Sequence, residues 1–194
     1  MVSKKIKMPS KIIKNVLSIF TGRILNSILY FILTMILMKS LSVSNYGTYA
    51  FYYSIISFSS FFLTFGVNNT YVTLITHANS IGEEKRYYNG YVTIKLFLTL
   101  IITISIISYQ LLTNNLVISI SLFSGLLFGL FESVKVPLQA KKEFKKIALI
   151  LPFRNILFIT IISFFLFINF LSLSSTIYTL LICNLINLLV FVFF

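Results

Sequence analysis

Long apolar runs separated by short polar stretches extend along the whole sequence. Each run has roughly 20 residues or more, the length that a helix needs to cross about 30 Å of hydrocarbon at about 1.5 Å per residue. None shows the polar/apolar alternation of a barrel strand, and a helix satisfies its backbone hydrogen bonds internally. The pattern predicts six membrane-spanning helices, over about Asn15–Met38, Tyr49–Thr76, Tyr91–Leu112, Leu116–Pro137, Ile147–Leu171 and Thr176–Phe194.

The composition excludes a soluble domain. Of the 194 residues, 58% are hydrophobic and only 10% are charged. A soluble domain of this length has too little interior to hide so much apolar surface, because most of its exterior must still face water. The sequence therefore predicts an all-α integral membrane protein, with a basic segment over residues 1–14 and a six-helix transmembrane bundle over residues 15–194.

Lysine and arginine are largely confined to alternate connections between the apolar runs. They precede the first run, separate the second from the third and separate the fourth from the fifth: Lys4, Lys5, Lys7, Lys11 and Lys14, then Lys85 and Arg86, then Lys141, Lys142, Lys145 and Lys146. The other connections contain only Lys39. Since cytoplasmic loops retain positive charge, this pattern predicts that both the N-terminus and the C-terminus are cytoplasmic.

The formal net charge of +12 has the same explanation. A strongly basic chain can bind nucleic acid, but these charges have the spacing that membrane topology requires, so no nucleic-acid partner is expected. The N-terminal stretch "KKIKMPSKIIK" is interpreted as a positive-inside anchor that touches anionic membrane lipid.

The sequence offers little material for catalysis or for binding a metal or cofactor. It has one cysteine (Cys183), one histidine (His77) and four acidic residues, all of them glutamate. Metal sites and acid/base pairs need several such groups close together, so we expect no enzyme activity, no metal and no cofactor. Cys183 is predicted to pack as a small hydrophobe. His77 is either an interfacial residue or a proton relay.

Five charged residues lie inside the predicted spans, all in the half nearer the basic connections: Arg23, Lys95, Glu132, Lys135 and Arg154. One interpretation is that the long basic side chains snorkel to the lipid headgroups. Arg23, roughly two turns from the interface, is expected to face protein or water, because a cation at that depth is costly. The functional interpretation places Arg23, Lys95, Arg154 and Lys135 around one water-filled cavity, where arginine forks would match phosphate oxygens.

Glu132 and Lys135 are three residues apart, so they share one helix face. Two roles for the carboxylate stay open. It can neutralise Lys135, or it can bind a coupling proton or cation.

Small residues recur at every fourth position of the fourth span, at Ser121, Gly125, Gly129 and Ser133. Such a ridge lets another helix approach closely, which predicts that this span is interior to the bundle.

Glycine and proline mark three irregular positions. The second run is unusually long, and "TFGVNNT" predicts either a break at Gly66 or a helix that projects beyond the bilayer. Pro137 and Pro152 flank the basic "AKKEFKK" and are expected to terminate or kink their helices.

Several motifs, in order along the chain, carry a resemblance to a known family. They are Gly22-Arg23 in the first span, "L-S-x-x-x-Y-G-x-Y" at Leu41, Ser42, Tyr46, Gly47 and Tyr49, then Gly66, and the "VPLQAKKEFKK" link between spans four and five. In these features the chain resembles bacterial polysaccharide and O-antigen flippases, members of the superfamily that includes multidrug and toxin extruders.

The resemblance implies a fold in which two bundles of six or more helices rock about a V-shaped cavity in the bacterial cytoplasmic membrane. It implies as substrate an oligosaccharide on a polyprenyl pyrophosphate, with Arg23, Lys95 and Arg154 at its headgroup and Lys135 beside them. The six predicted spans match one bundle, so we expect either a fragment or a half-transporter that pairs with a second helical bundle. Two other functions stay open, a related exporter of drugs or small cations and a non-transporting membrane scaffold.

Overall fold

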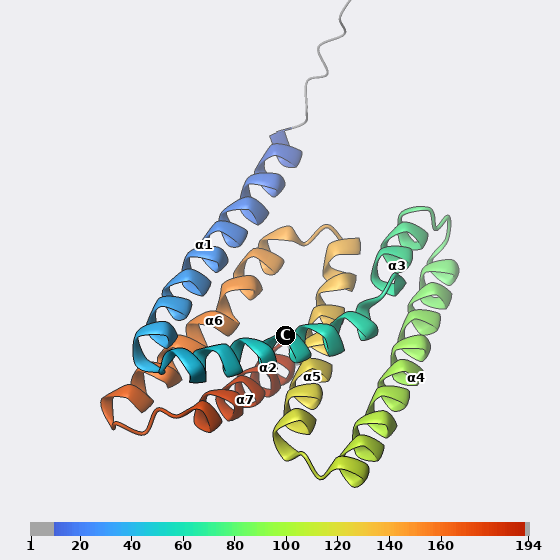
Figure 1. The fold of residues 1–194 in the computed structure, drawn as a ribbon. Helices are drawn as coiled ribbons and strands as arrows, with labels where there is room; N and C mark the ends of the chain where they lie inside the picture. Colours follow the sequence, from blue (N-terminus) through green and yellow to red (C-terminus); the bar gives the residue numbers. More distant parts are fainter. Residues whose placement is uncertain (1–9, 193–194) are drawn as a thin grey trace, which may run out of the picture.

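The computed structural model describes residues 10–192, which form seven helices joined by short connections (Figure 1). The helices are α1 (Ser10–Ser40), α2 (Val43–Thr64), α3 (Val67–Thr76), α4 (Ile81–Thr113), α5 (Leu116–Ala140), α6 (Phe144–Phe167) and α7 (Leu173–Val192). With α2 and α3 taken together, six segments of the described chain are long and apolar enough to cross a membrane. The prediction of an all-helical, multi-pass membrane protein with six spans is confirmed. The basic segment before Ser10 and the last two residues of the sixth predicted span lie outside the described residues.

Several helices extend beyond the hydrophobic runs that predicted them. α4 begins at Ile81, well before the predicted Tyr91, because Ser80 caps it: its hydroxyl accepts the Glu83 N–H at 3.2 Å, and a Glu83 carboxylate oxygen accepts the Asn79 N–H at 2.8 Å. The 33 residues of α4 span about 50 Å, more than the roughly 30 Å of hydrocarbon. Hydropathy therefore marks the membrane, and caps mark the helix ends.

The second span is interrupted at Gly66. α2 ends at Thr64 and α3 begins at Val67, with Gly66 between them at φ +64°. A residue with a Cβ atom rarely adopts this backbone conformation, so glycine allows the chain to change direction here. Of the two alternatives for this segment, the break at Gly66 is confirmed.

Both intramembrane prolines lie inside helices, so the alternative in which they terminate their helices is wrong, and the alternative in which they kink them stays a prediction. α5 continues through Pro137 to Ala140 because the carbonyl that the proline leaves without an N–H partner, that of Ser133, accepts the Tyr91 hydroxyl at 3.0 Å. Pro152 lies well inside α6. Pro152 has no N–H to donate to the Ala148 carbonyl. α1 lies close to that carbonyl, because a Cβ atom on Gly22 would be 2.8 Å from the Ala148 oxygen.

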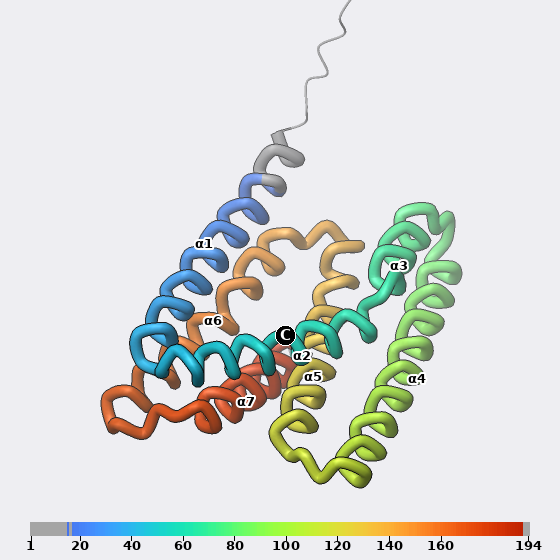
Figure 2. Tube along the Cα trace, viewed as in Figure 1, coloured from blue at the N-terminus to red at the C-terminus, as the bar shows by residue number. Residues whose placement is uncertain are grey.

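α5 lies at the centre of the bundle and contacts α2, α3, α4, α6 and α7. α1 instead runs along α6, although only a short connection separates it from α2 (Figures 1 and 2). The main apolar core joins α1, α2, α6 and α7 and includes Leu37, Ile56, Phe158, Ile162 and Cys183. Cys183 is fully buried with a free thiol, which confirms its prediction as a packed small hydrophobe.

The small residues of α5 lie in the interior, and two of them face α2. A Cβ atom on Gly125 would lie 2.7 Å from that of Ser59, and one on Gly129 would lie 3.1 Å from that of Leu63. The Ser59 hydroxyl donates to the Leu122 carbonyl at 3.0 Å across the same contact. Ser121 and Ser133, the other two positions of the ridge, are also buried. Gly125 is needed here because a Cβ atom would collide with the Ile56 oxygen, whereas one on Gly129 would only be tightly packed.

The basic connections lie together in space. The described start of α1, the α3–α4 connection and the α5–α6 connection are at one end of the bundle in Figure 1, and the α1–α2, α4–α5 and α6–α7 connections are at the other. This arrangement places the lysine-rich ends of the helices on one side, as the charge pattern requires. That this side is cytoplasmic stays a prediction.

Candidate functional site

Arg23, Glu132 and Lys135 line one cavity of about 250 Å³ between α1, α3, α5 and α6, which we call the polar cavity. Three amide side chains join them: Asn68, Asn69 and Gln139. Ile19, Val136, Phe144, Ile147 and Leu151 form the apolar part of the wall. The cavity therefore combines two cations, one carboxylate and three amides in a mainly apolar bundle.

Glu132 and Lys135 form an ion pair within α5. The Lys135 ammonium lies 2.5 Å from Glu132 Oε1 and 4.9 Å from the centre of the Phe131 ring. Lys135 is buried, and Glu132 is partly exposed. The carboxylate offsets the cost of burying the lysine, and the ring face adds a weaker attraction. Whether Glu132 also binds a coupling ion stays a prediction.

Arg23 enters the polar cavity from α1, and the contact between α1 and α6 fixes its position. The adjacent Gly22 packs directly on Ala148 of α6, so the α1 backbone is held close to that helix. The Arg23 side chain is exposed at the cavity. It is free to place its guanidinium against a ligand, because no carboxylate of the cavity other than the paired Glu132 competes for it.

The three amides of the polar cavity were not predicted from the sequence. Asn68 and Asn69 follow the Gly66 break directly, and the turn at Gly66 brings this part of α3 against α5. Gln139 lies one helical turn beyond Lys135 on α5. The paired asparagines after the glycine were the available signal, but only the packing of α3 shows that they face a cavity.

Arg154 lies at a different place, among aromatic side chains. Its guanidinium carbon is 4.3 Å from the centre of the Phe128 ring, and Nη2 donates to the Tyr53 hydroxyl at 3.4 Å. The neighbouring Asn155 is buried and donates to the Asn26 carbonyl at 3.2 Å. Arg154 therefore lies where α1, α2, α5 and α6 meet, and it is not part of the polar cavity wall.

Lys95 is at a third place and caps the end of α2. Its ammonium donates to the Leu63 carbonyl at 2.6 Å and lies 5.4 Å from the centre of the Tyr91 ring. At the break, the Val67 N–H turns to the Phe65 carbonyl, so the lysine takes the carbonyl that a continuous helix would have satisfied. A cation also suits the negative end of the helix dipole. The four predicted cations thus lie at three separate places in the structure: Arg23 and Lys135 at the polar cavity, Arg154 beside Tyr53, and Lys95 at the end of α2.

A sequence comparison assigns this membrane bundle to a family. The pattern of the family described as "Polysaccharide biosynthesis protein" matches residues 12–194.

The chain belongs to the polysaccharide biosynthesis protein family.

This family is of the flippase type, which confirms the resemblance found in the sequence. No curated protein and no solved structure matches the chain.

For this polysaccharide biosynthesis protein, the family implies a lipid-linked polysaccharide as substrate and a transporter, generally without enzyme activity. Residues 10–192 contain no group of three or more His, Cys, Asp or Glu side chains that could hold a metal ion. His77 is exposed at the end of α3.

At the α5–α6 connection, Lys146 Nζ lies 2.6 Å from Glu143 Oε2, and this contact lowers the pKa of the Glu143 carboxyl.

Proposed function

We propose that this chain is a bundle of a flippase that moves polyprenyl-pyrophosphate-linked oligosaccharide from the inner to the outer leaflet, for O-antigen or capsule synthesis in bacteria. The observation that carries the proposal is the polar cavity, in a chain whose family handles lipid-linked polysaccharide. Arg23 and Lys135 supply its positive charge, and the amides supply hydrogen bonds.

The charges of the polar cavity favour an anionic ligand. Glu132 neutralises Lys135, and this leaves the Arg23 charge for a ligand. A guanidinium fork matches two phosphate oxygens at once, and such charged hydrogen bonds are about twice as strong as neutral ones. A pyrophosphate also gives Lys135 a second anionic partner on the cavity side.

The amides suit the sugar next to the pyrophosphate. Each amide both donates and accepts hydrogen bonds, as sugar hydroxyls do. Asn68 and Asn69 come from α3 and Gln139 comes from α5, so two helices supply the amides of the cavity. We assign them to the sugar and assign Arg23 and Lys135 to the headgroup. Lys95 and Arg154, held by Leu63 and Tyr53, position α2 against its neighbours.

Transport by alternating access needs two bodies that move against each other. We therefore propose that this bundle acts with a second helical bundle, either from the same polypeptide or from another chain. The polar cavity would open toward that partner during the cycle.

An exporter of drugs or small cations is the nearest alternative. Such a substrate needs an unpaired carboxylate, whereas the carboxylate of the polar cavity is 2.5 Å from a lysine. A non-transporting scaffold is the other alternative, and it would not need Arg23.

The experiment measures the amount of polysaccharide on the surface of cells that lack the wild-type gene and express the Arg23→Ala protein. We expect surface polysaccharide to fall roughly tenfold or more, because the loss of a charge-assisted fork costs on the order of 1.4 kcal/mol or more. Arg86→Ala is the matched control, since Arg86 is exposed in the first turns of α4 outside the cavity. Normal delivery by a stably expressed Arg23→Ala protein would defeat the assignment.

A further inference from the structure

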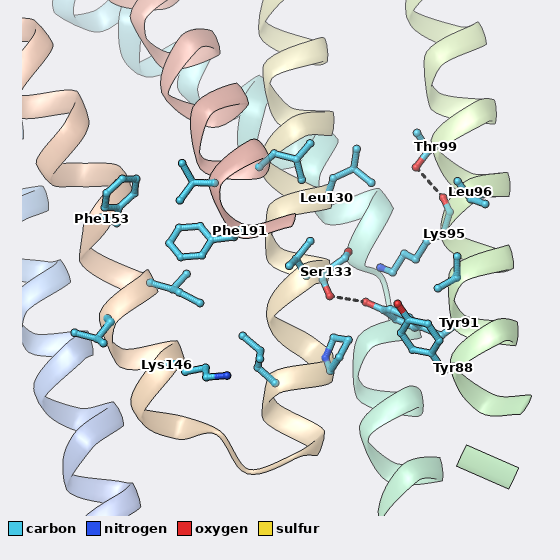
Figure 3. A pocket seen from close by; sticks show the side chains of 18 residues that line it. Tyr88, Tyr91, Lys95, Leu96, Thr99, Leu130, Ser133, Lys146, Phe153 and Phe191 are labelled. Atoms are coloured by element: carbon cyan, nitrogen blue, oxygen red, sulfur yellow. Dashed lines mark hydrogen bonds between the residues drawn. The ribbon is translucent and has the colours of Figure 1, made fainter. Parts of the chain in front are cut away.

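A second and larger cavity, of about 780 Å³, lies on another side of α5 (Figure 3). Its walls come from α4 and α6, its floor from α5 and its far end from α7. It shares no lining residue with the polar cavity. We call it the α4–α6 groove.

Apolar side chains line most of the groove, in stripes along the helices. Leu149, Ile150 and Phe153 follow Lys146 on one face of α6 at helical spacing. Leu130 and Val134 form part of the α5 floor. From Lys146 to Phe153 the stripe runs for about 10 Å. Such a stripe can contact part of a hydrocarbon chain that lies parallel to the helices.

The groove is open to the outside of the bundle. Leu149 on α6 is 76% exposed and Leu96 on α4 is 65% exposed. In a membrane-spanning protein, the space next to these residues is lipid, so a lipid chain can enter from the side. The volume is within the range of roughly 300–1,000 Å³ that is typical of sites for small molecules.

One end of the groove is polar and basic. Tyr88 of α4 and Lys146 of α6 both lie at the end nearest the α5–α6 connection (Figure 3). Lys146 pairs with Glu143, but its side chain is still 52% exposed, and Lys141, Lys142 and Lys145 surround this single carboxylate in the sequence. No acidic residue is among the described residues that line the groove. Deeper in, the ammonium of Lys95 is already bound to Leu63.

We propose that the α4–α6 groove binds one anionic phospholipid from the leaflet on the side of the α5–α6 connection, with its phosphate at Lys146, on the wall opposite Tyr88, and one acyl chain along α5. Charge complementarity carries this assignment, since basic pockets between transmembrane helices select anionic headgroups. The aromatic hydroxyl of Tyr88 is suited to the headgroup level of a membrane.

A polyprenyl chain has a similar amphipathic shape, but the position of the polar cavity disfavours it. A substrate whose pyrophosphate is at Arg23 and Lys135 cannot also place that group at Lys146, because the two cavities are lined by separate sets of residues. The choice of a phospholipid over a polyprenyl chain therefore rests on the proposed function, whereas the groove itself is formed by residues outside the polar cavity.

The test uses phosphatidylglycerol with a photoreactive group on one acyl chain, added to the purified full-length protein. Peptide mapping is expected to find adducts on Leu96, Leu149 or Phe153. At limiting lipid, Lys146→Gln is expected to reduce their yield about fivefold, the effect of one lysine near a headgroup. Lys145→Gln is the matched control, because Lys145 is exposed on the same turn but does not line the groove, and its yield should change less than about twofold. Lys146→Arg should restore labelling.

Three results would overturn the proposal. Equal labelling by a phosphatidylcholine probe, unaffected by Lys146→Gln, would show that the groove contacts the surrounding bilayer lipid without selecting an anionic headgroup. Displacement of the probe by polyprenyl phosphate, but not by unlabelled phosphatidylglycerol, would assign the groove to an isoprenoid chain. An absence of groove adducts in the full-length protein would show that the groove does not bind the lipid.

Discussion

A buried lysine in a membrane span needs an acceptor or a counter-charge, and Lys95 takes the carbonyl of Leu63 at 2.6 Å. The same residue type has a different partner at Lys135, where the acceptor is the Glu132 carboxylate. Arg154 is held by an aromatic ring and a tyrosine hydroxyl. Of the four cations, Arg23 is the one at a cavity with an exposed side chain. At the scale of residues, similar charges therefore have different roles.

Lys95→Met should destabilise the protein. Methionine fills a similar volume but leaves the Leu63 carbonyl without its donor, which costs about 1–3 kcal/mol for a buried group. Thermal unfolding of the purified protein in detergent should show a lower melting temperature than for the wild type. Lys85→Met, an exposed position in the first turns of α4, should leave it unchanged. An unchanged or raised melting temperature for Lys95→Met would show that the lysine is not needed to cap α2.

At the scale of elements, hydropathy predicted which segments are helices and failed at their ends. The polar turns of α4 before Tyr91 are held by Ser80 and Glu83, which hydropathy does not register. The break at Gly66 could be predicted because glycine and asparagine have local conformational preferences. The continuation of α5 through Pro137 could not be predicted, since it depends on a hydroxyl from a different helix, that of Tyr91.

Tyr91 and Pro137 should be coupled. Tyr91→Phe removes the donor to the Ser133 carbonyl and should cost about 1 kcal/mol. In a Pro137→Ala background the new backbone N–H can satisfy that carbonyl, so the same change should cost only a few tenths of a kcal/mol. A double-mutant cycle of unfolding free energies measures the difference. Equal costs in both backgrounds would instead assign the hydroxyl to Asn68, whose Oδ1 lies 3.1 Å away.

The break between α2 and α3 predicts that Gly66 is sensitive to substitution. Gly66→Ala should destabilise the protein by about 1–2 kcal/mol, because φ is +64° and a Cβ atom is disfavoured there. Gly90→Ala is the matched control: Gly90 is inside α4 with nothing within 4 Å of a Cβ atom, so alanine should be neutral or stabilising. Denaturant unfolding compares the two. Similar stabilities for both variants would argue against the break.

At the scale of the whole molecule, the site depends on how helices far apart in the sequence pack. The polar cavity takes Arg23 from α1, the asparagines from α3 and Lys135 from α5. Depth along a helix could be predicted from the sequence, so the cations were expected on one side of the membrane. Their division among three places could not, because it follows from α1 packing on α6 and from α5 at the centre. The same packing brings Asn68 and Asn69 to the polar cavity.

The proposed function requires that the polar cavity binds the pyrophosphate of a lipid-linked oligosaccharide through Arg23. The most direct measurement is the Kd of polyprenyl pyrophosphate for the full-length protein in zwitterionic nanodiscs, for the wild type, Arg23→Ala and Arg86→Ala. We expect binding about tenfold weaker for Arg23→Ala, with Arg86→Ala like the wild type. Equal affinity for all three proteins would contradict it.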